Sequence, residues 1–168
     1  MYKTKFTVAG DKKTLVVERA FDATRSKVWD AFTNPKLLAK WWGPRGWETE
    51  IRHMEFSDGG YWHYGMKCID PAQKDWYGNT SWGKATYKNI KPQDSFEYTD
   101  MFCDENGVTT PGMPVARSTL TFTEVGGITT VTSRTEYETP EALAQVLKMG
   151  MEEGLSQTWD RLDESLND

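Results

Sequence analysis

The sequence predicts an α+β fold: a curved antiparallel sheet of six to seven strands wrapped around a long C-terminal helix, with two short helices near the N-terminus. Two observations predict it. From Trp47 to Tyr137, strand-like segments alternate with short turns, as in an antiparallel meander. From Leu143 to Leu166, apolar residues recur at helical spacing. Laying this helix across the sheet buries an apolar face of each, so we expect one domain over residues 1–168.

The N-terminal segment predicts a β-hairpin. Polar and apolar residues alternate from Thr4 to Val8, and a second strand-like segment runs from Thr14 to Phe21. The residues between them, Ala9 to Lys13, favour a turn.

Two short helices are expected next. Thr24 is a suitable N-cap for a helix whose apolar positions are Val28, Trp29 and Phe32. Asn34-Pro35 is typical of the start of a second helix, which we expect to end at Gly43-Pro44.

The central part of the chain predicts the remaining strands. A polar loop from Asp70 to Thr80 interrupts them, and turn residues separate the others. The expected strands are Trp47–Met54, Tyr61–Met66, Trp82–Ile90, Ser95–Phe102, Val115–Thr123 and Ile128–Tyr137.

The C-terminal segment predicts one continuous helix. Thr139-Pro140-Glu141 combines an N-cap, a proline in the first turn and an acidic residue near the positive end of the helix dipole. The helix contains Gly150 and Gly154, and glycine in a helix interior costs about 0.5–1 kcal/mol. Either the helix approaches the sheet closely there, or the glycines leave room for a ligand.

Charge and composition exclude several functions. A net charge of −5 disfavours nucleic acid and anionic membranes as partners, and no apolar segment approaches the ~20 residues of a membrane span. Cys68 and Cys103 form no CxxC motif, and no secretory signal precedes the first strand, so we expect reduced thiols in a cytoplasmic protein. His53 and His63 are too scattered from the cysteines for a zinc site, so we expect no metal and no cofactor.

Aromatic residues make up 13% of the chain. They indicate either a core rich in large rings or a ligand cavity lined by them. Strand parity and the helix glycines predict the lining of a cavity between the last helix and the sheet: Trp62, Tyr64, Tyr98, Phe122, Met151 and Gly154, with Trp42 or Trp47 near the mouth. Asp100 shares the parity of Tyr98 and is a possible inward carboxylate.

Several motifs over residues 14–166 carry a family resemblance. They are Val17–Ala23, Val28–Pro35, Trp41–Pro44, Gly59–Tyr64, Leu120–Phe122 and Gly150–Leu155. Together they resemble the START-like (SRPBCC) superfamily with the helix-grip fold, and within it the branch named after the activator of the heat-shock-protein-90 ATPase. Thr24 departs from the pattern, because the family usually has proline at this helix start. The resemblance implies the fold and a cavity but no catalytic residue, because one scaffold carries many functions.

Three functions remain open. The first, which we favour, is binding or carriage of a small apolar or amphipathic molecule. The second is a cyclase- or hydrolase-type enzyme that uses a cavity carboxylate or tyrosine, such as Asp100. The third is co-regulation of a chaperone ATPase. In the family's namesake a separate N-terminal domain contributes to that activity, whereas this chain starts almost at its first strand, so we expect no chaperone partner.

Overall fold

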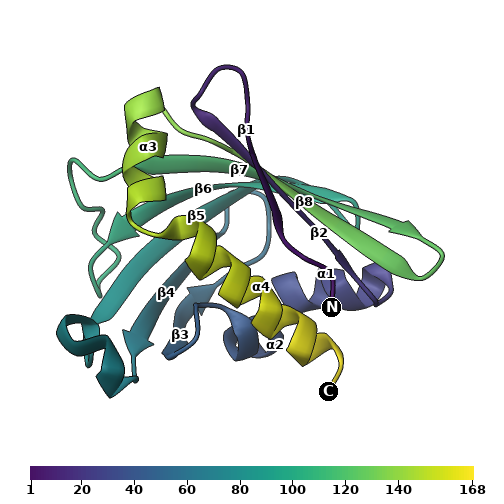
Figure 1. The fold of residues 1–168 in the computed structure, drawn as a ribbon, viewed down its shortest axis with the longest axis horizontal. Coiled ribbons are helices and arrows are strands. Elements are labelled where there is room, and N and C mark those ends of the chain that lie inside the picture. The colour runs from purple at the N-terminus through teal and green to yellow at the C-terminus, as the bar shows by residue number, and fades with distance from the viewer.

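The computed structural model describes residues 1–168 and contains one eight-stranded antiparallel sheet in the order β1-β2-β8-β7-β6-β5-β4-β3. The sheet is open, with β1 and β3 at its edges, and it curves around the C-terminal helices (Figure 1). The strands are β1 Lys5–Val8, β2 Thr14–Phe21, β3 Trp47–Met54, β4 Tyr61–Cys68, β5 Thr80–Lys91, β6 Ser95–Cys103, β7 Val115–Val125 and β8 Ile128–Glu136.

The predicted α+β helix-grip architecture is therefore confirmed, with one change in strand number. All eight segments with strand character pair, so the sheet is larger than the six to seven strands expected. The loop after β4 also contains a short 3₁₀ helix, η1 (Pro71–Trp76), where the Asp70 side chain accepts from the Ala72 N–H. No helix of the structure is long and apolar enough to cross a membrane.

The two short N-terminal helices are α1 (Arg25–Thr33) and α2 (Pro35–Trp41), and both begin at the predicted caps. The Thr24 hydroxyl accepts from the Lys27 N–H at 3.4 Å, and the Asn34 side chain accepts from the Lys36 N–H at 2.9 Å. These helices connect β2, the strand next to the edge strand β1, to β3, which forms the opposite edge of the sheet.

The single long C-terminal helix predicted from the sequence is wrong: the segment forms two helices, α3 (Pro140–Lys148) and α4 (Met151–Leu166). Gly150 separates them with φ +85°, a left-handed conformation that ends α3 and that glycine adopts without a steric penalty. The apolar stripe continues through the break, so periodicity alone did not reveal it. Figure 1 shows α4 running at an angle to α3 across the hollow of the sheet.

The packed core contains one group of the aromatic rings. Trp29 of α1 makes edge contacts with Phe56, Phe96 and Phe122 at centroid distances of 5.1–5.7 Å. Such pairs add stability beyond the burial of their area. We call Trp29 and these three phenylalanines the aromatic core; it fills the space between α1 and the sheet.

Buried ionic contacts hold α4 over the sheet. The guanidinium of Arg19 on β2 is almost fully buried and contacts Asp160 at 2.6 Å and Asp163 at 3.2 Å, both on α4. Because one cation joins two acidic side chains of the helix, this cluster fixes where α4 lies on the sheet.

Candidate functional site

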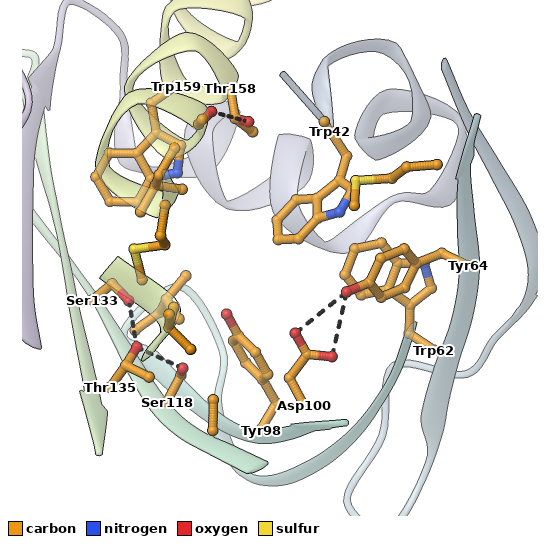
Figure 2. A pocket seen from close by; sticks show the side chains of 18 of the residues that line it. Trp42, Trp62, Tyr64, Tyr98, Asp100, Ser118, Ser133, Thr135, Thr158 and Trp159 are labelled. Carbon is orange, nitrogen blue, oxygen red and sulfur yellow. Dashed lines mark hydrogen bonds between the residues drawn. The ribbon is translucent and has the colours of Figure 1, made fainter. Parts of the chain in front are cut away.

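A cavity of about 460 Å³ lies between α3–α4 and the hollow face of the sheet (Figure 2). Eighteen of its 27 lining residues are hydrophobic, and its volume falls within the range of small-molecule sites. The aromatic residues thus serve both purposes considered above: one group packs in the aromatic core, and a second group lines this cavity. The second group contains Phe32, Trp42, Trp62, Tyr64, Tyr87, Phe96, Tyr98, Phe102, Tyr137 and Trp159, so Phe96 belongs to both groups.

Six of the eight residues predicted to bind a ligand lie on the cavity wall: Trp42, Trp62, Tyr64, Tyr98, Met151 and Gly154. The strand parity used to choose the inward face was therefore correct for β4 and β6. That these residues contact a ligand remains a prediction.

Phe122 and Trp47 do not line the cavity. Phe122 points inward as predicted, but α1 covers its part of β7, where its ring packs against Trp29 and Phe32. Trp47 packs on the outside against η1: its indole N–H donates to Gln73 Oε1 at 3.0 Å. Parity predicts which face a residue occupies, but it does not predict which helix covers each part of that face.

Gly154 leaves open space rather than permitting close packing. A Cβ built at Gly154 would meet no atom within 4 Å, and the residue lies on the cavity wall. The close-approach account of this glycine is therefore wrong. Gly150 also has open space around it, but its left-handed φ already explains why glycine occurs there.

An arginine of α4 orders the segment that carries Trp42. Arg161 Nη1 donates to the carbonyl oxygens of Gly43 at 2.7 Å and of Trp47 at 3.1 Å, and Nη2 donates to that of Lys40 at 3.2 Å. These bonds satisfy carbonyls at the end of α2. They join α4 to the segment between α2 and β3. This segment carries Trp42, whose ring packs against Trp62 at a centroid distance of 4.8 Å.

Asp100 of β6 is the one acidic residue on the cavity wall, where no lysine, arginine or histidine is present. The Tyr64 hydroxyl donates to both of its carboxylate oxygens, each at 3.3 Å. Gly83 of β5 makes this possible: a Cβ there would lie 2.5 Å from the Tyr64 hydroxyl oxygen. Three neighbouring strands therefore contribute to one polar contact in an apolar wall.

The protonation of this pair is shifted by its surroundings. Removal from water raises the pKa of Asp100 to about 7, while the hydrogen bond from Tyr64 opposes the rise. Burial and the neighbouring carboxylate raise the pKa of the Tyr64 phenol well above its ordinary value. Asp100 thus exchanges a proton near neutral pH, whereas Tyr64 acts as a hydrogen-bond donor.

A row of hydroxyl groups lies on the cavity wall at β7 and β8, and the sequence prediction missed it. Ser118 is 2.8 Å from the Thr135 hydroxyl, which also lies 3.5 Å from Ser133 (Figure 2). The parity of Leu120 and Val131 would have identified these positions as inward. Small hydroxyl residues in a strand resemble solvent-facing positions, so the sequence alone did not predict that they line the cavity.

A second cavity, of about 220 Å³, shares Tyr64, Asp100 and Tyr137 with the first. It continues between β4, β5 and β6 towards Trp82 and Pro114. Asp100 therefore lies where the two spaces meet.

Neither the cysteines nor the histidines form a reactive cluster. The structure contains no group of three or more His, Cys, Asp or Glu side chains that could hold a metal ion, and the two cysteines are unpaired and buried. His63 contacts the Asp104 carbonyl oxygen at 3.1 Å.

We predict that neither a chelator nor a reductant changes the melting temperature of the protein, because its His, Cys, Asp and Glu side chains form no cluster that could hold a metal ion and its two cysteines are unpaired. Thermal unfolding with and without EDTA, and with and without dithiothreitol, measures this. A decrease of several degrees with EDTA that zinc reverses would contradict the prediction.

The chain resembles solved structures along nearly its whole length. Protein Ms6760 of Mycobacterium smegmatis is 30% identical, with 96% of this chain and 95% of that one covered and a TM-score of 0.85. A Staphylococcus epidermidis protein is also 30% identical, with 96% and 93% covered and a TM-score of 0.81. An Arthrobacter aurescens protein is 26% identical, with 97% and 91% covered and a TM-score of 0.87.

No curated protein matches the chain. The model of one protein family does match it: activator of Hsp90 ATPase homolog 1-like protein, over residues 22–167. This match covers most of the chain and includes every motif of the family resemblance from Val28–Pro35 onwards, while Val17–Ala23 lies mostly before its start. The chain therefore belongs to the activator of Hsp90 ATPase homolog 1-like family, as its motifs predicted.

Proposed function

We propose that this protein binds a small apolar or amphipathic molecule in the cavity between α3–α4 and the sheet. The observation that carries the proposal is the cavity of about 460 Å³ whose wall is mostly hydrophobic. An apolar molecule gains free energy by leaving water for such a wall, at about 25 cal/mol per Å² of apolar surface buried. The hydroxyl row and Asp100 supply polar contacts that orient the ligand.

Gly154 provides the sharpest test. We predict that Gly154→Leu abolishes binding of N-phenyl-1-naphthylamine, a fluorescent apolar probe that is neutral at pH 8. The new side chain occupies open space in the cavity, and replacing glycine in a helix favours folding by about 0.8–1 kcal/mol. Probe fluorescence measures binding, and urea unfolding measures stability.

Gly154→Ala is the matched control, because it gives the same gain in helix propensity but adds only one methyl group. It should retain most of the probe binding. If the parent protein does not bind the probe, or if G154L binds it as tightly as the parent, the cavity is not the binding site. A G154L protein that loses 1–3 kcal/mol of stability would instead indicate overpacking.

A second function is supported by the Asp100–Tyr64 pair. A carboxyl with a pKa of about 7 is suited to general acid–base catalysis, and this one lies on the cavity wall, where a ligand would contact it. The two functions differ in what happens to the bound molecule. Mass spectrometry of the molecule extracted from purified protein, before and after incubation, distinguishes them, because a carrier returns its ligand unchanged.

We also propose that the protein acts in the cytoplasm, where its cysteines would remain reduced. Cys68 and Cys103 are unpaired and buried, which agrees with such a location.

A further inference from the structure

We propose that the cavity selects an apolar amine, whose ammonium group pairs with the carboxylate of Asp100. The inference rests on the proposed ligand-binding function and names the chemical class of the ligand. It depends on the charge of the wall, the aromatic surroundings of the carboxylate and its position in the cavity.

The charge of the wall is unbalanced. Asp100 faces no lysine, arginine or histidine among the residues that line either cavity. Its side-chain partner is the neutral Tyr64 hydroxyl at 3.3 Å. A carboxylate on an apolar cavity wall without a cationic partner is costly to keep in a protein, so a cation supplied by the ligand would complete the site.

Aromatic rings surround the place where this cation would lie. Figure 2 shows the Asp100 carboxylate pointing into the open space bounded by Tyr98, Trp42 and the Tyr64–Trp62 pair. Trp62 and Tyr64 are stacked at a centroid distance of 4.1 Å. Aromatic faces attract organic cations, and a carboxylate among them strengthens that attraction. The remaining wall suits the apolar part of an amine.

The same features disfavour an apolar acid. A ligand carboxylate would find no cation on the cavity wall and would lie in the same cavity as Asp100. Two carboxylates that share a site repel each other, and one of them must take up a proton. A neutral alcohol gains only an ordinary hydrogen bond, so the preferred order is amine, then alcohol, then acid.

Proton binding competes with the amine. The titratable groups near Asp100 come from β4, β5, β6 and the residue after β8. They are phenols and one thiol, and because burial raises the pKa of each, they stay protonated and neutral at physiological pH. These groups are Tyr64, Tyr87, Tyr98, Cys103 and Tyr137. The residues of α3 and α4 that line the cavity carry no charge. As the pH falls below the Asp100 pKa of about 7, the carboxyl is protonated and amine affinity falls, by up to tenfold per pH unit.

The test compares three probes with one naphthalene skeleton: 1-naphthylmethylamine, 1-naphthylmethanol and 1-naphthoic acid. Titration calorimetry at pH 8 should show the amine binding at least tenfold more tightly than the alcohol, and the acid binding most weakly. From pH 7 to pH 5 the amine should lose at least tenfold in affinity, whereas the alcohol should change less than threefold.

The variant Asp100→Asn should reduce the amine-to-alcohol affinity ratio to within threefold of one and remove its pH dependence. Asp75→Asn, an exposed carboxylate in η1, is the matched control and should keep the ratio. If D100N does not fold, the pH profile of the parent still tests the inference.

The outcomes separate the two proposals. If the alcohol binds to the parent but the amine binds no more tightly, the amine inference is wrong and the ligand-binding function stands. A preference that persists in D100N also overturns the inference. If neither the amine, the alcohol nor N-phenyl-1-naphthylamine binds, the proposed function itself fails.

Discussion

Arg19→Met should destabilise the protein by about 3–5 kcal/mol, because it removes the cation of a buried ionic cluster and leaves Asp163 without a charged partner. Arg19 is 2% exposed and Asp163 is 5% exposed, so water cannot replace the lost contact. The total stability of a domain this size is about 5–15 kcal/mol, so the loss is a large part of it. Urea unfolding monitored by circular dichroism measures the effect.

Two further variants identify the cause. The double variant Arg19→Met with Asp163→Leu should recover much of the loss, since it replaces a buried ion pair by apolar groups. Arg52→Met removes the exposed contact with Glu50 and should cost no more than about 1 kcal/mol. If R19M costs as little as R52M, the Arg19 cluster does not hold α4 on the sheet.

The Arg19 cluster illustrates what the sequence could not predict. Hydrophobic periodicity and turn residues predicted all eight strand segments and the caps at Thr24 and Asn34, because these signals are local. The contact between Arg19 and Asp163 joins residues 144 positions apart, and no local pattern encodes it. The break at Gly150 was missed for a different reason: a glycine inside an apolar stripe fits an interrupted helix and a continuous one equally well.

The cavity was predicted only in part, because some of its features follow from local sequence signals and others do not. Strand parity identified Tyr64, Tyr98 and the inward Asp100, because alternation is a property of the strand itself. Strand parity placed Phe122 correctly on the inner face but did not predict that Trp29 of α1 covers it, because that depends on how α1 crosses the sheet. The role of Gly83 could not be predicted from the sequence, because this glycine leaves room for the Tyr64 ring on the neighbouring strand.

Asp100 links the binding site to stability. Its pKa is raised from 3.8 to about 7 by burial, so the native state binds this proton more tightly than the unfolded chain does. Protonated Asp100 therefore stabilises the native state. This contribution to the free energy of unfolding is fully present below pH 4 and is lost as the pH rises from 4 to 7. Above pH 7 the ionised carboxylate destabilises the native state by up to about 4 kcal/mol, since each pKa unit corresponds to about 1.4 kcal/mol.

We therefore predict that Asp100→Asn stabilises the protein at pH 8. The carboxylate faces a cavity large enough to hold water, which reduces the penalty, and we expect a gain of about 2 kcal/mol. The asparagine oxygen still accepts the hydrogen bond from Tyr64, so the packing of the wall is preserved. Urea unfolding at a series of pH values measures the gain, which should shrink as the pH falls from 7 to 4.

Asp75→Asn, which alters an exposed carboxylate, should leave the stability within about 0.5 kcal/mol of the parent. If D100N is less stable than the parent at pH 8, or if its advantage is the same at pH 4, the Asp100 carboxylate is not destabilising. If the gain is found together with the loss of amine preference, the parent chain keeps a costly charge at the position where binding requires it. Natural proteins keep such destabilising groups mainly at functional sites, so that result would connect the stability of Asp100 to the function of the cavity.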